Sequence, residues 1–219
     1  MYRLCIFDLD GTLINSLGDL ADSVNEALRV EGLPEHEEAA YRYFVGNGAR
    51  KLIERALPAD RREDKALFDR VYHTYDEAYH RLCLNKTRPY EGIPELLDKL
   101  RAAGIRTAVL SNKPDPFTQH IAGHFFGRQM DLILGQREGI AKKPAPDGVL
   151  EIQRRLDVPP EETLFIGDTN VDVETAKNAG LCCLGVCWGF RGREELEAAG
   201  ADFLAENAGE ALRQILRGA

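Results

Sequence analysis

The stretch Leu4-Cys5-Ile6-Phe7-Asp8-Leu9-Asp10-Gly11-Thr12-Leu13 decides the fold of this chain. Four apolar residues, the length of a buried strand, are followed at once by two carboxylates one residue apart. Two such acids repel each other and resist burial unless a cation lies between them or one of them holds a proton. The stretch therefore predicts a buried strand that ends in an acidic turn, with a divalent metal as the balancing cation.

Length and charge limit the classes of function. The chain has 219 residues and a formal net charge of -8, and its sequence pI is near 5.2. Nucleic acids and anionic membranes call for concentrated Lys and Arg, so neither is expected as the main partner. The N-terminus shows no charged-then-apolar leader, and no apolar run approaches the roughly 20 residues that span a bilayer. We expect a cytoplasmic protein.

The five cysteines support that location. Cys5, Cys182, Cys183 and Cys187 lie in or beside strand-like apolar runs, and Cys83 stands alone in a helical stretch. An odd number in such settings is typical of reduced core thiols, and no second Cys or His cluster completes a structural zinc site.

Strand-like and helix-like segments alternate along most of the chain. The expected strands are residues 4–7, 107–110, 132–134, 164–166, 183–186 and 202–204. The expected helices between them are residues 94–103, 117–125, 146–156, 171–179 and 193–199. This alternation predicts an α/β fold with a Rossmann-like parallel sheet and helices on both faces.

One long segment breaks the alternation. From residue 15 to residue 85 the sequence shows amphipathic helical pattern and no convincing strand. The turn at residues 86–94, with its prolines and glycine, returns the chain to the sheet. We therefore expect a catalytic core of residues 1–14 and 86–219, with a helical cap of residues 15–85 inserted after the first strand.

Polar residues gather where the expected strands end, which is where open parallel sheets bind ligands. The candidates are Asp8, Asp10, Ser111, Asn112, Lys143, Asp168 and Asp172. Carboxylates of this kind hold Mg²⁺, and a hydroxyl, an amide and an ammonium suit phosphate oxygens. We expect Asp8, Asp168 and the Asp10 carbonyl as metal ligands, with Asp172 binding a metal water or orienting Lys143.

Each of these residues also has a purely structural interpretation. An Asp-Xaa-Asp pair can be a turn or a helix cap, and Ser111-Asn112 before Lys113-Pro114 can begin a helix. Lys142 replaces Lys143 if the loop shifts by one residue. Asp168 and Asp172 can cap and stabilise a helix N-terminus. The order and strand-end location of all four sets favour the functional interpretation.

The four sets together resemble the ordered motifs of the haloacid dehalogenase-like (HAD) superfamily. The motifs are Asp8-Leu9-Asp10-Gly11-Thr12-Leu13, Ser111-Asn112, Lys143-Pro144 and Gly167-Asp168-Thr169-Asn170-Val171-Asp172. The resemblance covers nearly the whole chain, including a helical cap after the first motif. It implies a Mg²⁺-dependent enzyme of the Rossmann-like HAD fold.

The resemblance also implies a role for each residue. Asp8 is the nucleophile that forms an aspartyl-phosphate, and Asp10 protonates the leaving alkoxide and then activates water. Lys143 and Mg²⁺ neutralise the charge on Asp8 and the phosphoryl oxygens, while Ser111 and Asn112 donate hydrogen bonds to the transferred group. Backbone amides from Leu9 to Thr12, including Gly11, complete the phosphate cradle.

The expected substrate is inferred from the sequence of the cap. Residues 44–52, Phe-Val-Gly-Asn-Gly-Ala-Arg-Lys-Leu, resemble the cap loop of phosphoglycolate phosphatases, as does the run from Asp168 to Gly180. Gly46, Asn47, Gly48 and Arg50 are therefore the expected specificity residues, with Arg50 facing a substrate carboxylate. The glycines can equally serve a tight turn, and Arg50 can equally point to solvent.

The superfamily also includes reactions other than phosphate-ester hydrolysis, and the sequence bears on each of them. Asp10 argues against dehalogenation, because displacing halide needs no protonated leaving group. Phosphonate cleavage needs a cap lysine, for which Lys51 is a formal candidate in a position typical of a solvated side chain. A sugar phosphomutase of the β-phosphoglucomutase kind, or a broad-specificity sugar or nucleotide phosphatase, uses the same two aspartates. A receiver module that holds phosphate without turnover is a more remote alternative.

We therefore expect a Mg²⁺-dependent phosphomonoester hydrolase that acts on a small phosphorylated metabolite, with 2-phosphoglycolate as the leading substrate. No nucleic-acid or membrane partner is expected. No isolated apolar stripe demands an oligomer, so a monomer and a homodimer both fit.

Overall fold

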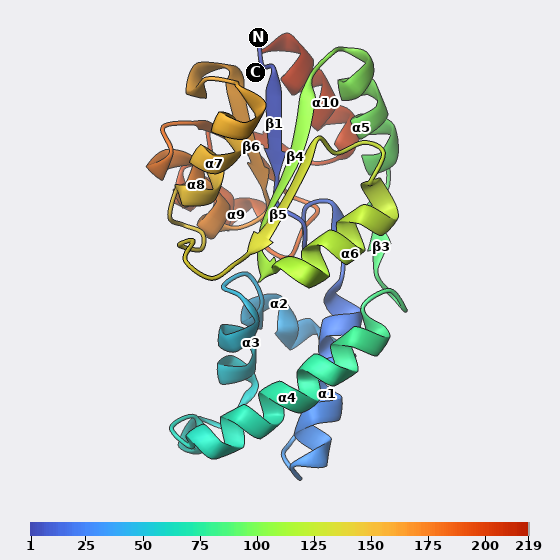
Figure 1. Ribbon diagram of the computed structural model, residues 1–219, viewed down its shortest axis with the longest axis vertical. Coiled ribbons are helices and arrows are strands. Elements are labelled where there is room, and N and C mark those ends of the chain that lie inside the picture. The colour runs from blue at the N-terminus through green and yellow to red at the C-terminus, as the bar shows by residue number, and fades with distance from the viewer. Residues whose placement is uncertain (219) are drawn as a thin grey trace. The chain divides into compact units, whose positions relative to one another are not determined.

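The computed structural model describes residues 1–218 and divides into two compact units (Figure 1). The first unit comprises residues 1–14 together with the chain from Pro89 onward, and the second comprises Asn15–Arg88. Two two-residue strands, β2 (Ile14–Asn15) and β3 (Arg88–Pro89), lie at the boundaries between them.

The first unit is built on a parallel sheet of six strands in the order β5-β4-β1-β6-β7-β8. Every neighbouring pair is parallel, and β1 is buried along its whole length. The strands are β1 (Leu4–Phe7), β4 (Arg106–Pro114), β5 (Leu132–Gln136), β6 (Thr163–Gly167), β7 (Cys182–Val186) and β8 (Phe203–Ala205). The predicted α/β fold with a parallel sheet is confirmed.

Helices cover both faces of this sheet (Figure 1). One face carries α7 (Asp147–Leu156), α8 (Asn170–Asn178) and α9 (Arg193–Ala199), and the other carries α5 (Ile93–Ala102), α6 (Asp115–Phe126) and α10 (Ala208–Arg217). A short 3₁₀ turn, η3 (Pro160–Glu162), precedes β6. Alternate residues of each strand point to opposite faces, and Leu4 and Ile6 of β1 pack with Phe165 against α7, α8 and α9.

Strand β4 is longer than the expected strand at residues 107–110. It continues through Ser111, Asn112 and Lys113 to Pro114, which pairs with Gln136 after an irregularity in the register. These three polar side chains are buried. The apolar pattern ends at Leu110, so the pattern alone could not show that the strand goes on.

Helix α10 (Ala208–Arg217) was not predicted from the sequence. This helix is short and amphipathic, with Gly209 in its first turn, and its N-terminus is capped by Asn207, whose side chain accepts a hydrogen bond from Glu210 N at 2.9 Å.

The second unit consists of helices. Its elements are α1 (Leu17–Val30), η1 (Glu38–Ala40), α2 (Tyr41–Phe44), α3 (Ala49–Ala56), η2 (Ala59–Arg61) and α4 (Lys65–Leu82). Helices α1 and α4 pack together, with Val24 and Leu28 buried on α1 and Val71 and Tyr75 buried on α4.

Asp19 binds the last residues of this second unit to its first helix. It is fully buried in α1 and accepts hydrogen bonds from the backbone of Lys86 at 2.8 Å and from the backbone and hydroxyl of Thr87 at 2.8 and 2.7 Å. These bonds to a charged acceptor tie residues 86 and 87 to α1. The boundary therefore falls after residue 88, three residues later than the turn in the sequence suggested.

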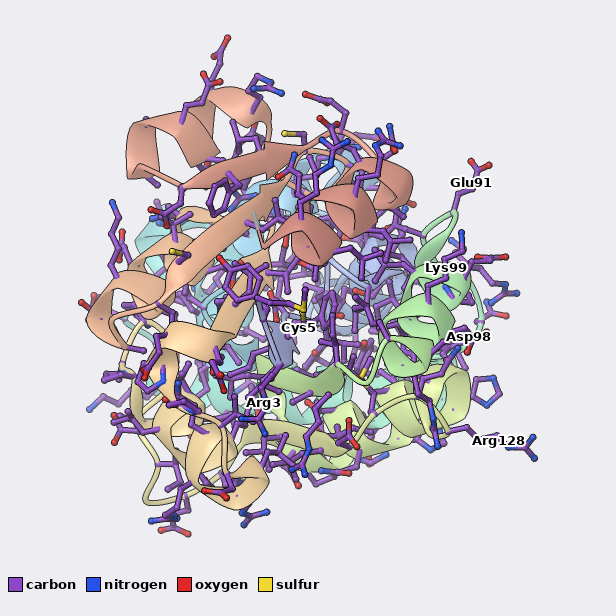
Figure 2. All side chains as sticks on the ribbon, turned by 90° about the horizontal axis from the view of Figure 1, so that it is seen from above. Arg3, Cys5, Glu91, Asp98, Lys99 and Arg128 are labelled. Atoms are coloured by element: carbon purple, nitrogen blue, oxygen red, sulfur yellow. The ribbon has the colours of Figure 1, made fainter. Side chains whose placement is uncertain are left out.

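The structure agrees with the expectation of reduced cysteines, since all five are free thiols. Cys5 lies inside the core, whereas charged side chains such as Glu91 and Lys99 point outward (Figure 2). Within residues 1–218, none of the helices has both the length and the apolar character required to cross a bilayer.

Candidate active site

The predicted strand-end residues meet at the carboxyl edge of the sheet. The chain leaves β1 toward β4 on one side and returns to β6 on the other, so the strand order reverses at β1. The end of β1 is hydrogen-bonded to the end of β6, since Asp8 N donates to Ile166 O at 2.9 Å. Asp8 thus follows the central strand at the position where this fold class binds ligands.

Lys143 lies at the centre of the acidic residues. Its Nζ is 2.9 Å from Asp8 Oδ1 and 2.7 Å from Asp172 Oδ1, and its side chain is 3% exposed. Burial alone would lower the pKa of this ammonium, but the two carboxylates raise it above its usual range. Lys143 is therefore a permanent cation. Lys142, the alternative from the sequence, is exposed.

Asn112 fixes the backbone of Lys143. Its amide nitrogen donates to Lys143 O at 3.0 Å, and its amide oxygen accepts from Lys143 N at 2.8 Å. The side chain that the resemblance assigned to phosphate is thus engaged in holding the lysine loop. Ser111 is buried, and its Oγ accepts a hydrogen bond from Lys113 N at 3.2 Å.

Asp172 has two contacts that the sequence offered as alternatives. Its Oδ1 binds Lys143, and its Oδ2 accepts from the backbone and hydroxyl of Thr169 at 3.0 and 2.8 Å. The bond from the Thr169 backbone is one half of the capping box of α8, and the Thr169 side chain accepts the other half from the Asp172 backbone. Asp172 therefore caps the helix and orients Lys143 at the same time.

Asp168 is held by residues from two other loops. It is fully buried, its Oδ1 accepts from the Thr12 hydroxyl at 3.1 Å, and its Oδ2 accepts from Phe190 N at 2.8 Å. Trp188 Nε1 donates to the Thr12 carbonyl at 3.1 Å. A Cβ added at Gly189 would overlap the Asp168 side chain and the Gly11 carbonyl.

The segment Trp188-Gly189-Phe190 was missed in the sequence analysis. It follows β7 at the same sheet edge as the other site residues. The signal available in the sequence was a glycine between two aromatic residues directly after an apolar strand, a pattern typical of a close backbone approach.

Gly11 and Thr12 contact Asp168 and their own turn. Gly11 has a φ of +88°, and its N–H donates to Ile14 O at 2.8 Å. Thr12 N donates to Leu9 O at 3.3 Å, and Leu9 N donates to Asp8 Oδ1 at 2.7 Å. These amides are engaged within the turn, and Gly11 and Thr12 both contact Asp168. Their part in a phosphate cradle stays a prediction.

The three buried acids fit a divalent cation. One oxygen from each of Asp8, Asp168 and Asp172 lies within 4.8 Å of the others. Burial raises the pKa of Asp8 to about 7, against the opposing effect of Lys143. Burial also raises the pKa of Asp168 well above its usual range, and the neighbouring acids add to that shift. One ammonium cannot balance three buried carboxylates, and oxygen donors suit Mg²⁺.

Asp10 is paired with a second lysine. Lys113 Nζ is 3.0 Å from Asp10 Oδ1 and 2.8 Å from Oδ2, and the two side chains are 5% and 17% exposed. Lys113 comes from the end of β4 and was read in the sequence only as part of a helix start. The signal for its role was its place directly after Ser111 and Asn112.

The expected specificity loop lies in the helical unit. Gly46 and Gly48 have φ values of +104° and +87°, which a residue with a side chain rarely adopts. Arg55 of α3 donates to Phe44 O at 2.9 Å and to Asn47 Oδ1 at 2.7 Å. Arg55 therefore fixes the loop of residues 43–48, a role the sequence analysis did not assign.

Arg50 and Lys51 have contacts within the same unit. The Arg50 guanidinium lies over the Phe68 ring, 4.6 Å from its centroid, and 5.6 Å from that of Tyr72. The contact between Arg50 and a substrate carboxylate stays a prediction. Lys51 forms a surface ion pair with Glu54 at 2.6 Å, as expected for a solvated side chain.

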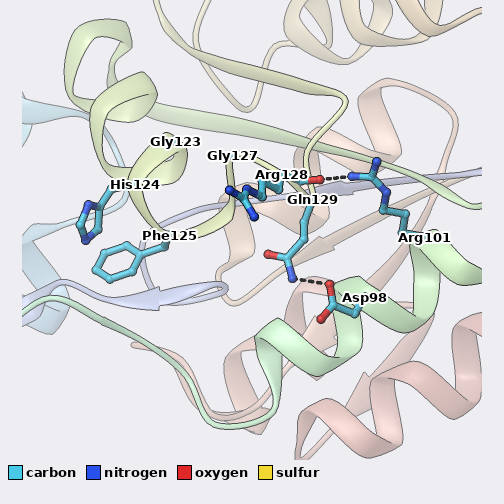
Figure 3. Close-up of a pocket in the computed structure, with 8 residues that line it drawn as sticks. All are labelled: Asp98, Arg101, Gly123, His124, Phe125, Gly127, Arg128 and Gln129. Carbon is cyan, nitrogen blue, oxygen red and sulfur yellow. Dashed lines mark hydrogen bonds between the residues drawn. The ribbon is translucent and has the colours of Figure 1, made fainter.

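A large open hollow of about 930 Å³ lies elsewhere on the first unit (Figure 3). It is bounded by the C-terminal ends of α5 and α6, with Asp98 and Arg101 on one side and His124 and Arg128 on the other. The segment after α6 adjoins the start of β4, since Thr107 N donates to Asp131 Oδ2 at 2.8 Å. The hollow therefore belongs to the amino edge of the sheet, opposite the acidic residues.

Comparison with known proteins places the chain in a family. A family model of haloacid dehalogenase-like hydrolases matches residues 2–180. The chain is 35% identical to a phosphoglycolate phosphatase of Pseudomonas putida, over 99% of this chain and 79% of that protein. It is 33% identical to a phosphoglycolate phosphatase of Vibrio cholerae, over 98% of this chain and 97% of that protein.

Solved structures give the same result. A candidate phosphoglycolate phosphatase of Lactobacillus delbrueckii superposes with a TM-score of 0.93 at 31% identity, covering 98% of each chain. CbbY of Rhodobacter sphaeroides, solved with phosphate, superposes with a TM-score of 0.77 at 28% identity, covering 96% of each chain. The family match covers the strand-end residues from Asp8 to Asp172 and ends before the segment Trp188-Gly189-Phe190. The chain therefore belongs to the haloacid dehalogenase-like hydrolases.

Proposed function

We propose that this hydrolase is a Mg²⁺-dependent phosphatase that cleaves 2-phosphoglycolate through an aspartyl-phosphate on Asp8. One observation carries the proposal: Lys143 joins Asp8 to Asp172 beside the buried Asp168, while Lys113 holds Asp10 separately. The two neighbouring aspartates thus have different lysine partners, which supports a different role for each of them. The names of the relatives support phosphoglycolate as the substrate.

In the first step, Asp8 attacks the phosphorus of the ester. A lone pair of the carboxylate forms an O–P bond, and the bond from phosphorus to the ester oxygen breaks with its electrons on that oxygen. Asp10 gives its proton to this oxygen, which leaves as the alcohol. Lys143 lowers the repulsion between Asp8 and the incoming dianion because its charge is fixed 2.9 Å from Asp8 Oδ1.

In the second step, water hydrolyses the aspartyl-phosphate. Asp10, now a carboxylate, takes a proton from the water while the water oxygen bonds to phosphorus. The bond between Asp8 and phosphorus breaks, its electrons return to Asp8, and inorganic phosphate leaves. In this proposal Ser111, buried in β4, donates a hydrogen bond to the transferred group.

Asp8, Asp168 and the Asp10 carbonyl would hold the Mg²⁺ ion, with Asp172 acting through Lys143 and a metal water. The ion supplies positive charge that neutralises the nucleophile and the phosphoryl oxygens. Thr12 and Phe190 N hold Asp168 in place for this purpose.

The helical unit acts as the cap in this proposal, and the loop of residues 43–48 selects the substrate. The net charge of -8 supports a free metabolite rather than nucleic acid or an anionic membrane as the partner. We place the enzyme in the cytoplasm, as a monomer or a homodimer.

A sugar phosphatase is the second candidate, because a variant of Rhodobacter sphaeroides CbbY was solved with xylulose-(1,5)bisphosphate and resembles this chain at a TM-score of 0.76. The family match gives no support to a receiver module without turnover.

A screen of phosphate esters by kcat/KM tests the proposal, since this ratio reports transition-state discrimination. We expect 2-phosphoglycolate to exceed xylulose 1,5-bisphosphate, hexose phosphates and nucleotides by at least about tenfold. A preference for a sugar phosphate by the same margin would replace the substrate and leave the mechanism. No Mg²⁺-dependent release of phosphate from any ester would refute the proposed function.

A further inference from the structure

The Asp10–Lys113 pair is a separate ion pair within the site. Lys113 Nζ contacts both oxygens of Asp10, at 3.0 and 2.8 Å, so the ammonium restrains the position of the carboxylate group. The two residues come from different segments of the chain, Lys113 from the end of β4 and Asp10 from the turn after β1. The other lysine of the site, Lys143, contacts Asp8 and Asp172 instead.

Stability does not account for this pair. A buried ion pair is often no more stable than apolar residues of similar volume, because both charges lose their hydration. The Lys113 side chain is only 5% exposed, so its ammonium is almost fully removed from water. A lysine in this position therefore points to a function for which the charge itself is needed.

The backbone of Lys113 is also held firmly. Its N–H donates to Ser111 Oγ at 3.2 Å, and its carbonyl accepts from the Thr118 hydroxyl at 3.1 Å. A Cβ at Gly135 of the neighbouring strand β5 would approach this carbonyl to 2.8 Å. The stem of the lysine thus starts from a rigid strand end, which suits a side chain that must place another group accurately.

We propose that Lys113 is a positioning residue that holds the Asp10 carboxyl group for proton transfer to the leaving oxygen. The inference rests on the proposed function. When Asp10 gives up its proton, the ester O–P bond breaks, the alcohol leaves, and the new carboxylate charge forms beside the Lys113 ammonium. The same contact keeps the carboxylate in place to take a proton from water in the second step.

Three esters distinguish this role from other roles of a lysine. In p-nitrophenyl phosphate the leaving group departs without a proton, whereas 2-phosphoglycolate and 2-hydroxyethyl phosphate release alcohols that need one. The last two esters differ in that only phosphoglycolate carries a carboxylate. The three esters therefore give a different pattern of kcat/KM losses for each possible defect. The defects are a loss of proton transfer, a loss of carboxylate binding and a general distortion of the site.

We expect Lys113→Met to lower kcat/KM for both alkyl esters by about 100-fold or more, and for the aryl ester by less than about threefold. With the aryl ester, kcat should fall and a burst of nitrophenol equal to the enzyme concentration should appear, because the second step still needs Asp10. Lys99→Met is the matched control, since this lysine is exposed on α5 (Figure 2), and it should behave as the wild type.

Double variants keep the test decisive if Lys113→Met is less stable. Asp10→Asn should show the same pattern among the three esters, and adding Lys113→Met to it should lower kcat/KM no further. Equal losses on aryl and alkyl esters, or an added loss in the double variant, would overturn the inference. A loss confined to phosphoglycolate would also overturn it, assigning Lys113 to the substrate carboxylate. Wild-type enzyme inactive on all three esters would instead refute the proposed function.

Discussion

The strand-end acids of the first unit and the loop of residues 43–48 in the second are fixed in different ways. The acids lie at the sheet edge, and their partners come from other segments of the core, Lys143 on Asp8 from the loop after β5 and Lys113 on Asp10 from the end of β4. The loop has left-handed glycines and is held by Arg55 of the helix that follows it. The sheet therefore fixes the groups proposed for the chemistry, and a local arrangement shapes the segment proposed for substrate choice.

The largest expected effect comes from the nucleophile. Asp8→Asn should lower kcat/KM for every ester by at least about 10³-fold, because the amide cannot form the covalent intermediate. Steady-state assays of phosphate release measure this loss. Asp69→Asn, at an exposed aspartate of α4, is the control. Turnover of Asp8→Asn within tenfold of the wild type would exclude Asp8 as the nucleophile.

A smaller effect is expected from the support of Asp168. Gly189→Ala should weaken Mg²⁺ binding by about 10- to 100-fold, because the added Cβ would displace the Asp168 side chain. Isothermal titration with Mg²⁺ measures the change. Gly192→Ala is the matched control, since a Cβ there meets nothing within 4 Å. Equal affinity in the two variants would show that this contact does not shape the metal site.

Metal binding should depend on pH in a defined direction. Burial raises the pKa of Asp8 from 3.8 to about 7, so between these values the folded state binds more protons than the unfolded state. The free energy of unfolding of the metal-free protein should therefore fall as pH rises from about 4 to about 7. Mg²⁺ competes with that proton, so its stabilising effect should grow from pH 5 to pH 8. Thermal unfolding with and without Mg²⁺ measures both trends, and a Mg²⁺ effect that shrinks with rising pH would contradict them.

The loop should affect substrate choice more than chemistry. Arg55→Met should raise KM for phosphoglycolate by about tenfold and leave kcat for p-nitrophenyl phosphate within about twofold, since only the loop of residues 43–48 loses its hydrogen bonds. Lys51→Met, on the same helix but in a surface ion pair, is the control. A similar loss with both esters would mean that Arg55 supports the reaction as well.

The smallest effect is expected at Arg50, if stacking is its main role. Arg50→Met removes the contact with the Phe68 and Tyr72 rings, which should cost up to about 1 kcal/mol in the free energy of unfolding. KM for phosphoglycolate should change by less than about twofold. Urea unfolding and steady-state kinetics measure the two quantities. A tenfold rise in KM for phosphoglycolate that is absent for 2-hydroxyethyl phosphate would assign Arg50 to the substrate carboxylate.

Much of the fold was predictable because apolar runs of strand length alternate with helical periodicity. Knowing that parallel strands end at one edge was enough to bring Asp8, Lys143, Asp168 and Asp172 together. The partners of Asp10 and Asp168 could not be read in this way. Lys113 follows the apolar run of its strand, and its partner is 103 positions away in the sequence.

The contacts of the helical unit were harder to predict. Arg50 and Arg55 lie on one short helix, and helical periodicity does not say which of them faces the loop. The choice follows from tertiary packing, in which Phe68 of α4 attracts Arg50 and the carbonyl of Phe44 is left to Arg55. The same limit applies to the segment Trp188-Gly189-Phe190, whose contact with Asp168 depends on the order of the strands.

The phosphorylated residue itself gives the most direct test of the central claim, that Asp8 is the nucleophile and Asp10 the proton carrier. Asp10→Asn enzyme would be mixed with radiolabelled p-nitrophenyl phosphate and Mg²⁺, quenched in acid within the first turnover, digested, and mapped by mass spectrometry. We expect close to one phosphoryl group per enzyme, on the peptide that contains Asp8, and no label in the Asp8→Asn variant. Label on another residue, or turnover with no labelled enzyme at any time, would contradict it.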